Sequence, residues 1–394
     1  MIRAGVGSSN AANPRTAARE AAAAALAQAG LRAAAGALCF VSSAYGGAFP
    51  MILRAVADAA GTREVAGCGA LGTIANGREC ESGRSLAVMV FGDGELTAKR
   101  LFAAPARGRA DELAAELAAA ARPHLGPDNL LCLFPDSYNL EAEPFLAALA
   151  RELPGVAIVG GGATEDGAAG ETFQFCGDVV SSNAVAGMLL SGNFAVTIGA
   201  ANACAPLGRL HRVTAARDNV VLELDGRRAW DVFAEAAGPL ADDPPRARAF
   251  VFAALPLDPA AERLERNGFV VRNVVGVSPQ HGAVAIAHRP RVGEMIGFAL
   301  RDGERSRAEL KAELERLDAA VAGAPPAFGL YFDCASRGAG LYGVPDHDAA
   351  YIARQFPHLP LAGFFTGFEI GPLGAGAGLL QYCGVLALIA PRVH

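Results

Sequence analysis

The chain has 394 residues, of which 47 are glycine, and it is 52% hydrophobic and 19% charged, with a net charge of −6. A half-apolar chain of low charge can bury enough surface to fold, and glycines without an every-third-residue period exclude a collagen-like rod. The acidic balance without a dense basic run argues against nucleic-acid binding, and the absence of an 18-residue apolar run argues against a membrane span.

The first predicted element is a helix in the Ala-rich stretch 17–29. Asn13 followed by Pro14 is typical of a helix N-cap and first helical position. Arg19 and Glu20 distinguish this stretch from the apolar part of a signal peptide, so we expect a helix of the mature protein. Eight cysteines without a CxxC pair, several of them inside apolar runs, indicate buried, reduced thiols and a cytoplasmic location.

Three stretches of the chain share one order of predicted elements: an apolar strand, a polar loop, a helix and a short strand that ends in glycine. They span residues 37–68, 130–162 and 329–364, and each is followed by another apolar strand. Strand–helix–strand units of about 30 residues favour parallel pairing with right-handed crossovers. The predicted fold class is therefore α/β: two domains with mixed, mostly parallel sheets built from repeated strand–loop–helix–strand units.

A different pattern lies between the second and third repeats. We predict a helix that carries Trp230 and Phe233, and a capping box at Ser306–Glu309 that begins a second helix. Predicted strands occupy residues 209–213, 220–224, 250–254, 269–275 and 283–287. We expect a first domain at 1–208, with two repeats, and a second at 209–394, with the third. The Gly-rich stretch 371–378 is predicted to be a loop.

One glycine motif resembles a dinucleotide-binding loop. Residues 67–72 fit GxGxxG after a predicted strand, but the Rossmann motif requires a helix to follow. Asn76-Gly77 instead predicts a tight hairpin turn. The sequence therefore does not favour a dinucleotide cofactor.

The loop after the third repeat's first strand carries the strongest candidate for a ligand site. Cys334 and Arg337 lie where α/β folds bind ligands, at the carboxyl edge of a sheet, and an arginine can hold a carboxylate with two hydrogen bonds. A nucleophilic Cys334 is an alternative, which requires a histidine such as His281 or His347 nearby in space. The third interpretation is an ordinary structural loop.

Thr366 and Glu369 lie among glycines and aromatic residues near the C-terminus. Glu369 is placed either to anchor an ammonium group or to pair with Arg337. Ser42 and Asp136 occupy the matching post-strand loops of the other two repeats, which extends the candidate ligand site. Glycines can let a ligand approach the backbone closely, and those we assign to the site are Gly67, Gly161 and Gly363.

These motifs resemble those of FIST proteins (F-box and intracellular signal transduction), a family of small-ligand sensory modules with N- and C-terminal parts. The resemblance spans residues 35–390, and its motifs lie at 65–72, 159–163, 182–192, 213–215, 224–226, 332–338 and 360–371. The last two segments are the most specific. The family usually has Gly-Glu where this chain has Gly72-Thr73, so a ligand contact of that glutamate would be altered here.

The resemblance implies an intracellular sensor of a small molecule, such as an amino acid or another carboxylate metabolite, that signals to a separate protein. No catalytic residue, metal or cofactor is predicted. Haem-based gas sensing is an alternative because some relatives are linked to haem, although the sequence shows no haem signature. A cysteine-dependent enzyme that uses Cys334 is the other alternative.

Overall fold

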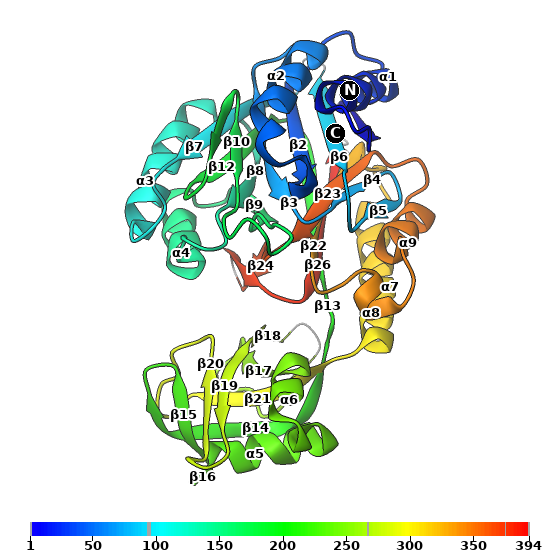
Figure 1. Ribbon diagram of the computed structural model, residues 1–394. Helices are drawn as coiled ribbons and strands as arrows, with labels where there is room; N and C mark the ends of the chain where they lie inside the picture. The colour runs from blue at the N-terminus through cyan, green and yellow to red at the C-terminus, as the bar shows by residue number, and fades with distance from the viewer. Residues whose placement is uncertain (1, 93–95, 266–267, 375, 393–394) are drawn as a thin grey trace. The chain divides into compact units, whose positions relative to one another are not determined.

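A computed structural model describes residues 2–92, 96–265, 268–374 and 376–392, and the chain divides into two compact units (Figure 1). Unit 1 comprises residues 1–200, 310–379 and 383–394, and unit 2 comprises 201–309 and 380–382. The expected second domain, 209–394, is therefore not one compact unit. The reason is that unit 2 is an insertion in the third repeat, whose remaining strands lie in unit 1.

Unit 1 contains three copies of one order of elements, which confirms the repeat. Repeat 1 comprises β1 (Arg3–Ser9), α1 (Pro14–Ala29), β2 (Gly36–Ser42), α2 (Phe49–Ala60), β3 (Val65–Ala70), β4 (Thr73–Ala75), β5 (Arg78–Cys80) and β6 (Leu86–Gly92). Repeat 2 comprises β7 (Leu96–Ala103), α3 (Ala110–Ala121), β8 (Asp128–Pro135), α4 (Ala142–Glu152), β9 (Ala157–Gly161), β10 (Gln174–Cys176), β11 (Val179–Ser181) and β12 (Val185–Gly192). Repeat 3 comprises β13 (Phe194–Asn202), α7 (Gly303–Val321), β22 (Phe328–Cys334), α8 (Ala339–Tyr342), α9 (His347–Gln355), β23 (Leu361–Thr366), β24 (Glu369–Leu373), β25 (Gly376–Leu380) and β26 (Cys383–Pro391).

Each repeat forms a six-stranded mixed sheet, as the α/β fold class predicts. The parallel pairs are β2 with β3, β8 with β9 and β22 with β23. The return strands β6, β12 and β26 run antiparallel to the first strand of each pair. Most neighbouring strands in these sheets are therefore antiparallel, whereas the sequence predicts mostly parallel sheets. The reason is that the short connections after each parallel pair reverse the direction of the chain.

The three sheets exchange hairpins in a cycle. The β4–β5 hairpin of repeat 1 joins the sheet of repeat 3 beside β23, and the β10–β11 hairpin of repeat 2 joins that of repeat 1 beside β3. Strands β24 and β25 of repeat 3 complete the sheet of repeat 2 beside β9. Each repeat therefore needs another to complete its sheet. The predicted loop at 371–378 is wrong in most of its length, since most of the stretch lies in β24 and β25; residue 375 lies outside the described residues.

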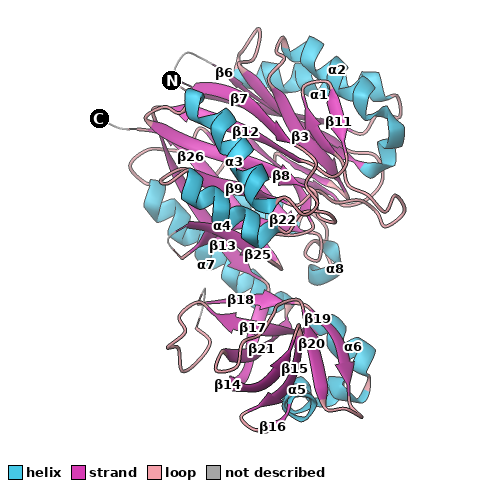
Figure 2. Ribbon diagram, turned by 90° about the vertical axis from the view of Figure 1, so that its left-hand side faces the viewer, coloured by secondary structure: helices cyan, strands magenta, loops and turns pink. Residues whose placement is uncertain are grey.

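The inner faces of the sheets meet in an aromatic core, and helices cover the outer faces (Figure 2). Phe40, Phe134 and Phe332 occupy equivalent positions of β2, β8 and β22, and all three are fully buried. The Phe40 and Phe134 rings have centroids 5.3 Å apart, and Phe364 lies within 4.8 Å of Phe40. Rings at such separations add to the stability that burial itself gives.

The local signals for helices are partly confirmed. The Asn13 side chain accepts a hydrogen bond from the Thr16 backbone N–H, so α1 begins where predicted. The helix is rich in alanine because it packs closely on β1, where a β carbon at Gly7 would lie 2.0 Å from the Ala21 carbonyl oxygen. The capping box at Ser306 is wrong: α7 begins one turn earlier, and the Asp302 carboxylate accepts from the Arg305 N–H.

Unit 2 follows β13 in the chain and is mainly antiparallel. Its strands lie in the order β18-β17-β21-β14-β15-β20-β19, with β16 beside β15. The bounds of its elements are β14 (Cys204–Arg217), β15 (Val220–Leu224), β16 (Arg227–Arg228), α5 (Ala229–Ala237), α6 (Pro244–Phe250), β17 (Val251–Pro256), β18 (Phe269–Arg272), β19 (Val274–Ser278), β20 (Ala283–Ile286) and β21 (Met295–Arg301). The five predicted strands and the helix with Trp230 are therefore present in this unit.

A glycine in each repeat lets the two parallel strands approach closely. A β carbon at Gly363 would lie 1.7 Å from the Tyr331 carbonyl oxygen. At the equivalent Gly67 and Gly160, the distances to the carbonyl oxygen of the neighbouring strand would be 1.9 and 2.0 Å. The space at Gly67 and Gly363 is thus filled by the chain's own backbone, which leaves no room there for the ligand that the sequence predicts.

We expect Gly363→Ala to lower the free energy of unfolding by about 3 kcal/mol, because the added methyl group overpacks a buried strand pair. The matched control is Gly323→Ala, where no heavy atom lies within 4 Å of the new β carbon and a change within about 0.5 kcal/mol is expected. Urea unfolding of the full-length chain measures both. Equal stability of the two variants would show that the strands can separate at no cost.

Candidate functional site

Each repeat has one parallel strand pair, whose first strand is β2, β8 or β22. The side of this strand that faces the helices distinguishes repeat 3 from the other two repeats. In β2 and β8 this side carries apolar residues of the cores, such as Val41 and Leu133. In β22 the corresponding side carries Tyr331 and Asp333, both fully buried. Cys39 of β2 pairs with Gly67, and Tyr331 of β22 pairs with Gly363. When the two strands are aligned on these pairs, Asp333 occupies the position of Val41. A polar group buried there must be compensated by hydrogen bonds or by a charge.

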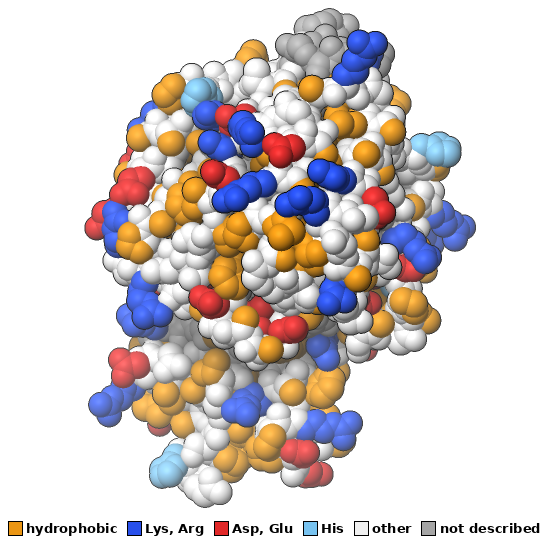
Figure 3. Space-filling view, turned by 45° about the horizontal axis from the view of Figure 1, so that its top comes forward, with side chains coloured by type: hydrophobic (Ala, Val, Ile, Leu, Met, Phe, Trp, Pro, Cys, Tyr) orange, Lys and Arg blue, Asp and Glu red, His pale blue; other side chains and the backbone are white. Residues whose placement is uncertain are grey.

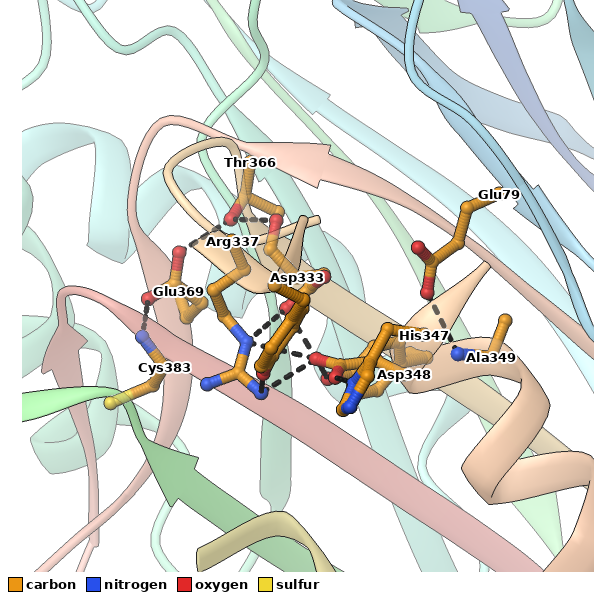
Figure 4. A network of polar contacts seen from close by, with 11 residues as sticks. Glu79, Asp333, Arg337, His347, Asp348, Ala349, Thr366, Glu369 and Cys383 are labelled. Carbon is orange, nitrogen blue, oxygen red and sulfur yellow. Dashed lines mark hydrogen bonds and ion pairs between the residues drawn. The ribbon is translucent and has the colours of Figure 1, made fainter. Parts of the chain in front are cut away.

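Arg337 provides that charge (Figure 4). The turn after β22 is closed by a hydrogen bond from the Arg337 N–H to the Cys334 carbonyl, which directs the side chain back over the strand. Its Nε lies 2.8 Å from Asp333 Oδ1 and 2.9 Å from Asp348 Oδ2. Its Nη2 donates to Asp348 Oδ2 at 2.6 Å and to the Tyr342 hydroxyl at 2.7 Å. The guanidinium is thus held between two carboxyl groups, with no exposed side-chain surface.

Asp348, at the start of α9, is the most fully bonded of these carboxyl groups. The Tyr331 hydroxyl donates to its Oδ2 at 2.8 Å, and His347 Nδ1 lies 2.8 Å from its Oδ1. The His347 ring stacks on Tyr342, with centroids 3.7 Å apart. Burial alone would raise the pKa of Asp348, but the Arg337 charge and these hydrogen bonds outweigh it and hold that pKa below its usual range. Asp348 is therefore the ionised partner of Arg337.

Asp333 has the opposite character. Burial, followed by the negative charge of Asp348, raises its pKa well above the usual range for an aspartate. Its Oδ1 is bonded, whereas its buried Oδ2 has no hydrogen-bond partner among the described residues. A neutral carboxyl group with a spare oxygen atom thus lies beside an ionised pair. Buried polar atoms without partners are rare in proteins and call for an explanation.

A second polar group lies on the other side of Asp333. The Thr366 hydroxyl is 3.0 Å from the Asp333 carbonyl oxygen and 2.6 Å from Glu369 Oε1, while the Cys383 N–H donates to Glu369 Oε2. A hydroxyl has one proton to donate, so both contacts are satisfied together when Thr366 donates to the carbonyl and a protonated Glu369 donates to Thr366. Burial raises the pKa of Glu369 to about 8, which agrees with this geometry.

The hairpin exchanged from repeat 1 brings a third carboxyl group. Glu79 of β5 accepts a hydrogen bond from the Ala349 N–H of α9 at 2.7 Å, and its own N–H donates to Asp346. Burial raises the pKa of Glu79 to about 7, and its Oε2 has no partner among the described residues. Figure 4 shows Glu79 and Glu369 on opposite sides of the Arg337 pair. The pKa values of Glu79 and Glu369 thus lie near neutrality, so we expect these two carboxyl groups to change protonation there.

The structure brings together six of the predicted site residues. Cys334 and Arg337 follow β22, and Thr366 and Gly363 lie in β23. Gly161 of repeat 2 is the register partner of Glu369, and a β carbon there would lie 2.3 Å from the Thr366 methyl group. Of the two interpretations of Glu369, the direct pair with Arg337 does not form, because Asp333 and Asp348 bind the guanidinium and Glu369 bonds with Thr366 and Cys383.

The other predicted residues lie in repeats 1 and 2 and hold the chain itself. The Ser42 hydroxyl accepts from the Ser85 N–H, and the Asp136 carboxylate accepts from the N–H groups of Tyr138, Asn139 and Asn183. The segments that follow β3 and β9 contact the end of β23. The Thr164 hydroxyl accepts from the Leu71 N–H and donates to the Phe365 carbonyl, which links all three repeats.

The central residues Asp333, Asp348 and Glu79 are not among the predicted site residues, and His347 is named there only as a possible partner of a nucleophilic Cys334. A local signal existed for Asp333, which ends an apolar strand four residues before Arg337. None existed for Asp348 or Glu79, because α9 and the β4–β5 hairpin reach the site only through the tertiary fold. Among the described residues, no group of three or more His, Cys, Asp or Glu side chains is arranged to hold a metal.

Comparison with known proteins gives matches over nearly the whole chain. The model of the FIST N domain matches residues 36–227, and that of the FIST C domain matches residues 229–372. An uncharacterised protein of Mycobacterium tuberculosis is 31% identical over 261 residues, which cover 66% of this chain and 68% of that protein. One of Mycobacterium bovis is 32% identical over 264 residues, covering 66% and 67%.

Among solved structures, cyanuric acid hydrolase from A. caulinodans aligns over 100% of both chains with a TM-score of 0.39 and 11% identity. Within the part of the chain that the structure describes, no helix is both long enough and apolar enough to span a membrane.

Proposed function

Because the chain belongs to the FIST family, whose domains are sensory domains of signal transduction, we propose that it binds a small molecule in repeat 3 and signals to a separate protein. The observation that carries this proposal is the ionisable group around Arg337, buried where the other repeats carry apolar side chains. Burying an ion pair removes charges from water, and the lost hydration can exceed the attraction between the two partners. A buried pair beside carboxyl oxygens that have no hydrogen-bond partner in the described part of the chain therefore adds little to stability, which supports a functional role.

The chemistry of the group favours a ligand with both an ammonium and a carboxylate, such as an amino acid. A carboxylate can replace a carboxyl partner of Arg337, while neutral Asp333 and Glu369 can lose their protons to bind an ammonium. We propose that Cys334 and Thr366 complete the site, and that Gly161 and Gly363 contribute through the close strand packing that holds Thr366 in place. Ser42 and Asp136 support the site through the loops that they hold, and Gly67 supports it through the close packing of β2 and β3.

We propose that α8 moves when the ligand binds. This short helix covers Arg337 through the Tyr342 hydroxyl, and glycines with positive φ flank it, at 64° for Gly338 and 73° for Gly343. Displacing Tyr342 and its stacked neighbour His347 would change the surface of α9, and a ligand shifts such an equilibrium by its preference for one state. Cys39 and Cys132 are fully buried in core strands, a use of thiols that supports a cytoplasmic location.

A thermal-shift screen of the full-length chain with amino acids and small carboxylates tests the proposal. Ligand at 100 times its Kd adds about 2.7 kcal/mol, so we expect at least one compound to raise Tm by about 5 °C. Glu369→Gln preserves the neutral hydrogen-bonding pattern and should abolish the shift, whereas Glu315→Gln on the surface of α7 should retain it. No shift with any compound, or an equal shift in Glu369→Gln, would refute the site.

A further inference from the structure

A long groove runs between α1 and α2 on the outer face of repeat 1, away from the Arg337 group. Its volume is about 840 Å³. The α1 side presents Arg15, Arg19 and Ala23, which are spaced four residues apart and therefore lie on one helical face. The α2 side presents Met51, Arg54, Ala55, Asp58 and Ala59, which share a face in the same way. The two rows form a channel whose length matches about two and a half helical turns.

The arginines of this groove have no partners of their own. Among the described residues, Arg15, Arg19 and Arg54 take part in no hydrogen bond or ion pair, and all three are exposed. The acidic side chain of the groove, Asp58, pairs with Arg63 at 3.5 Å. The groove therefore presents three uncompensated positive charges on a chain whose net charge is −6.

A second cavity, of about 330 Å³, extends the positive surface beyond Arg54. Arg54 lines both cavities, and Arg63 and Arg100 line the second. The Arg100 guanidinium donates to the Arg63 carbonyl oxygen at 2.6 Å, which fixes its position. Figure 3 shows Lys and Arg side chains standing beside apolar ones on a face of the molecule. Asp178 also lines this cavity, so the arginines beyond Arg54 are partly balanced by acidic side chains, and the unpaired positive charge lies in the groove itself.

Apolar surface lies between these charges. Met51 is 43% exposed, and Ala23 is exposed on the facing helix. Small side chains keep the groove open, so a third helix can place apolar residues on its floor and acidic residues against the arginines. This combination is the helix-in-groove mode of recognition, in which apolar anchors give affinity and charges select the partner.

We propose that the α1–α2 groove binds an acidic amphipathic helix of the protein that receives the signal. Such a helix would present apolar residues at i, i+3 or i+4 and i+7, with Asp or Glu on the flanks that face Arg15, Arg19 and Arg54. The inference rests on the proposed function only for the role of the partner. Peptide binding is measured without any small ligand. A failure to bind peptides therefore argues against the groove alone, and a failed ligand screen argues against the Arg337 site alone.

Selection from a displayed library of random 18-residue peptides on the immobilised full-length chain tests the inference. We expect the enriched peptides to be acidic, with apolar residues at helical spacing. Binding of a synthetic enriched peptide is then measured by fluorescence anisotropy. The charge-reversal variant Arg19→Glu/Arg54→Glu should bind the peptide at least tenfold more weakly. For the unmodified chain, 300 mM salt should also weaken binding, because it screens the attraction between the arginines and the acidic peptide.

The matched control is Arg32→Glu/Arg354→Glu, which makes the same change of net charge at exposed arginines of unit 1 outside the groove. Its affinity for the peptide should stay within twofold of the unmodified chain. Three results would overturn the proposal: no enriched peptide that depends on Arg19 and Arg54, enrichment of neutral or basic peptides, or displacement of every acidic peptide by millimolar inorganic phosphate. The last would indicate a small-anion site instead.

Discussion

Replacement of Arg337 by Met is expected to lower the free energy of unfolding by about 3–5 kcal/mol, although Met matches much of the arginine's volume. The guanidinium is the direct partner of both Asp333 and Asp348, and all three side chains are fully buried. Its removal leaves the ionised Asp348 without its counter-charge in the core. Urea unfolding followed by circular dichroism measures the loss.

Two further variants separate loss of charge from loss of packing. Arg354→Met removes an exposed arginine of α9 and should change stability by less than about 0.5 kcal/mol. Adding Asp348→Asn to Arg337→Met removes the uncompensated charge and should restore part of the lost stability. Trp230 is the single tryptophan and lies in unit 2, so its fluorescence distinguishes a loss in unit 1 from unfolding of the whole chain. A stable Arg337→Met variant would contradict an ionised pair.

Much of the repeat could be predicted because its signals are local. Apolar strands, the Asn13-Pro14 helix start and the Asn76-Gly77 turn each lie within a few residues, and the structure contains all of them. The cyclic exchange of hairpins could not be predicted, because it depends on which sheet edge a hairpin reaches in space. The same holds for the division of the chain, since an insertion separates β13 from α7 without a marked change in composition.

The candidate site could be predicted only in part for a related reason. Residues near the ends of β22 and β23 lie close together because neighbouring parallel strands end at one edge of the sheet. Which partner Arg337 takes depends on α9, whose Asp348 is eleven residues away, and the spacing of residues does not decide between Asp348 and Glu369. Burial of the whole group follows from the three-sheet packing, and burial determines the protonation of Asp333 and Glu369.

Stability is expected to fall as pH rises from about 5 to 8, and Glu369 is a main cause. Its pKa is about 8 in the folded chain and 4.5 as the reference value, so between these values the folded state binds a proton that the unfolded state does not. That contribution is complete below pH 4.5 and is lost as pH rises through 8, at about 1.4 kcal/mol per pH unit within the window. Glu79, with a pKa of about 7, adds to the loss in the same direction.

Glu369→Gln isolates this effect, because the amide can donate to Thr366 and accept from the Cys383 N–H as the protonated acid does. We expect the variant to gain stability over the unmodified chain by a few kcal/mol between pH 5 and pH 9. Glu315→Gln should follow the profile of the unmodified chain, since Glu315 is exposed on α7. Parallel profiles for Glu369→Gln and the unmodified chain would mean that Glu369 is ionised when folded. An ionised Glu369 would offer a ligand a fixed negative charge, and the proposed exchange of a proton for an ammonium would then have no basis.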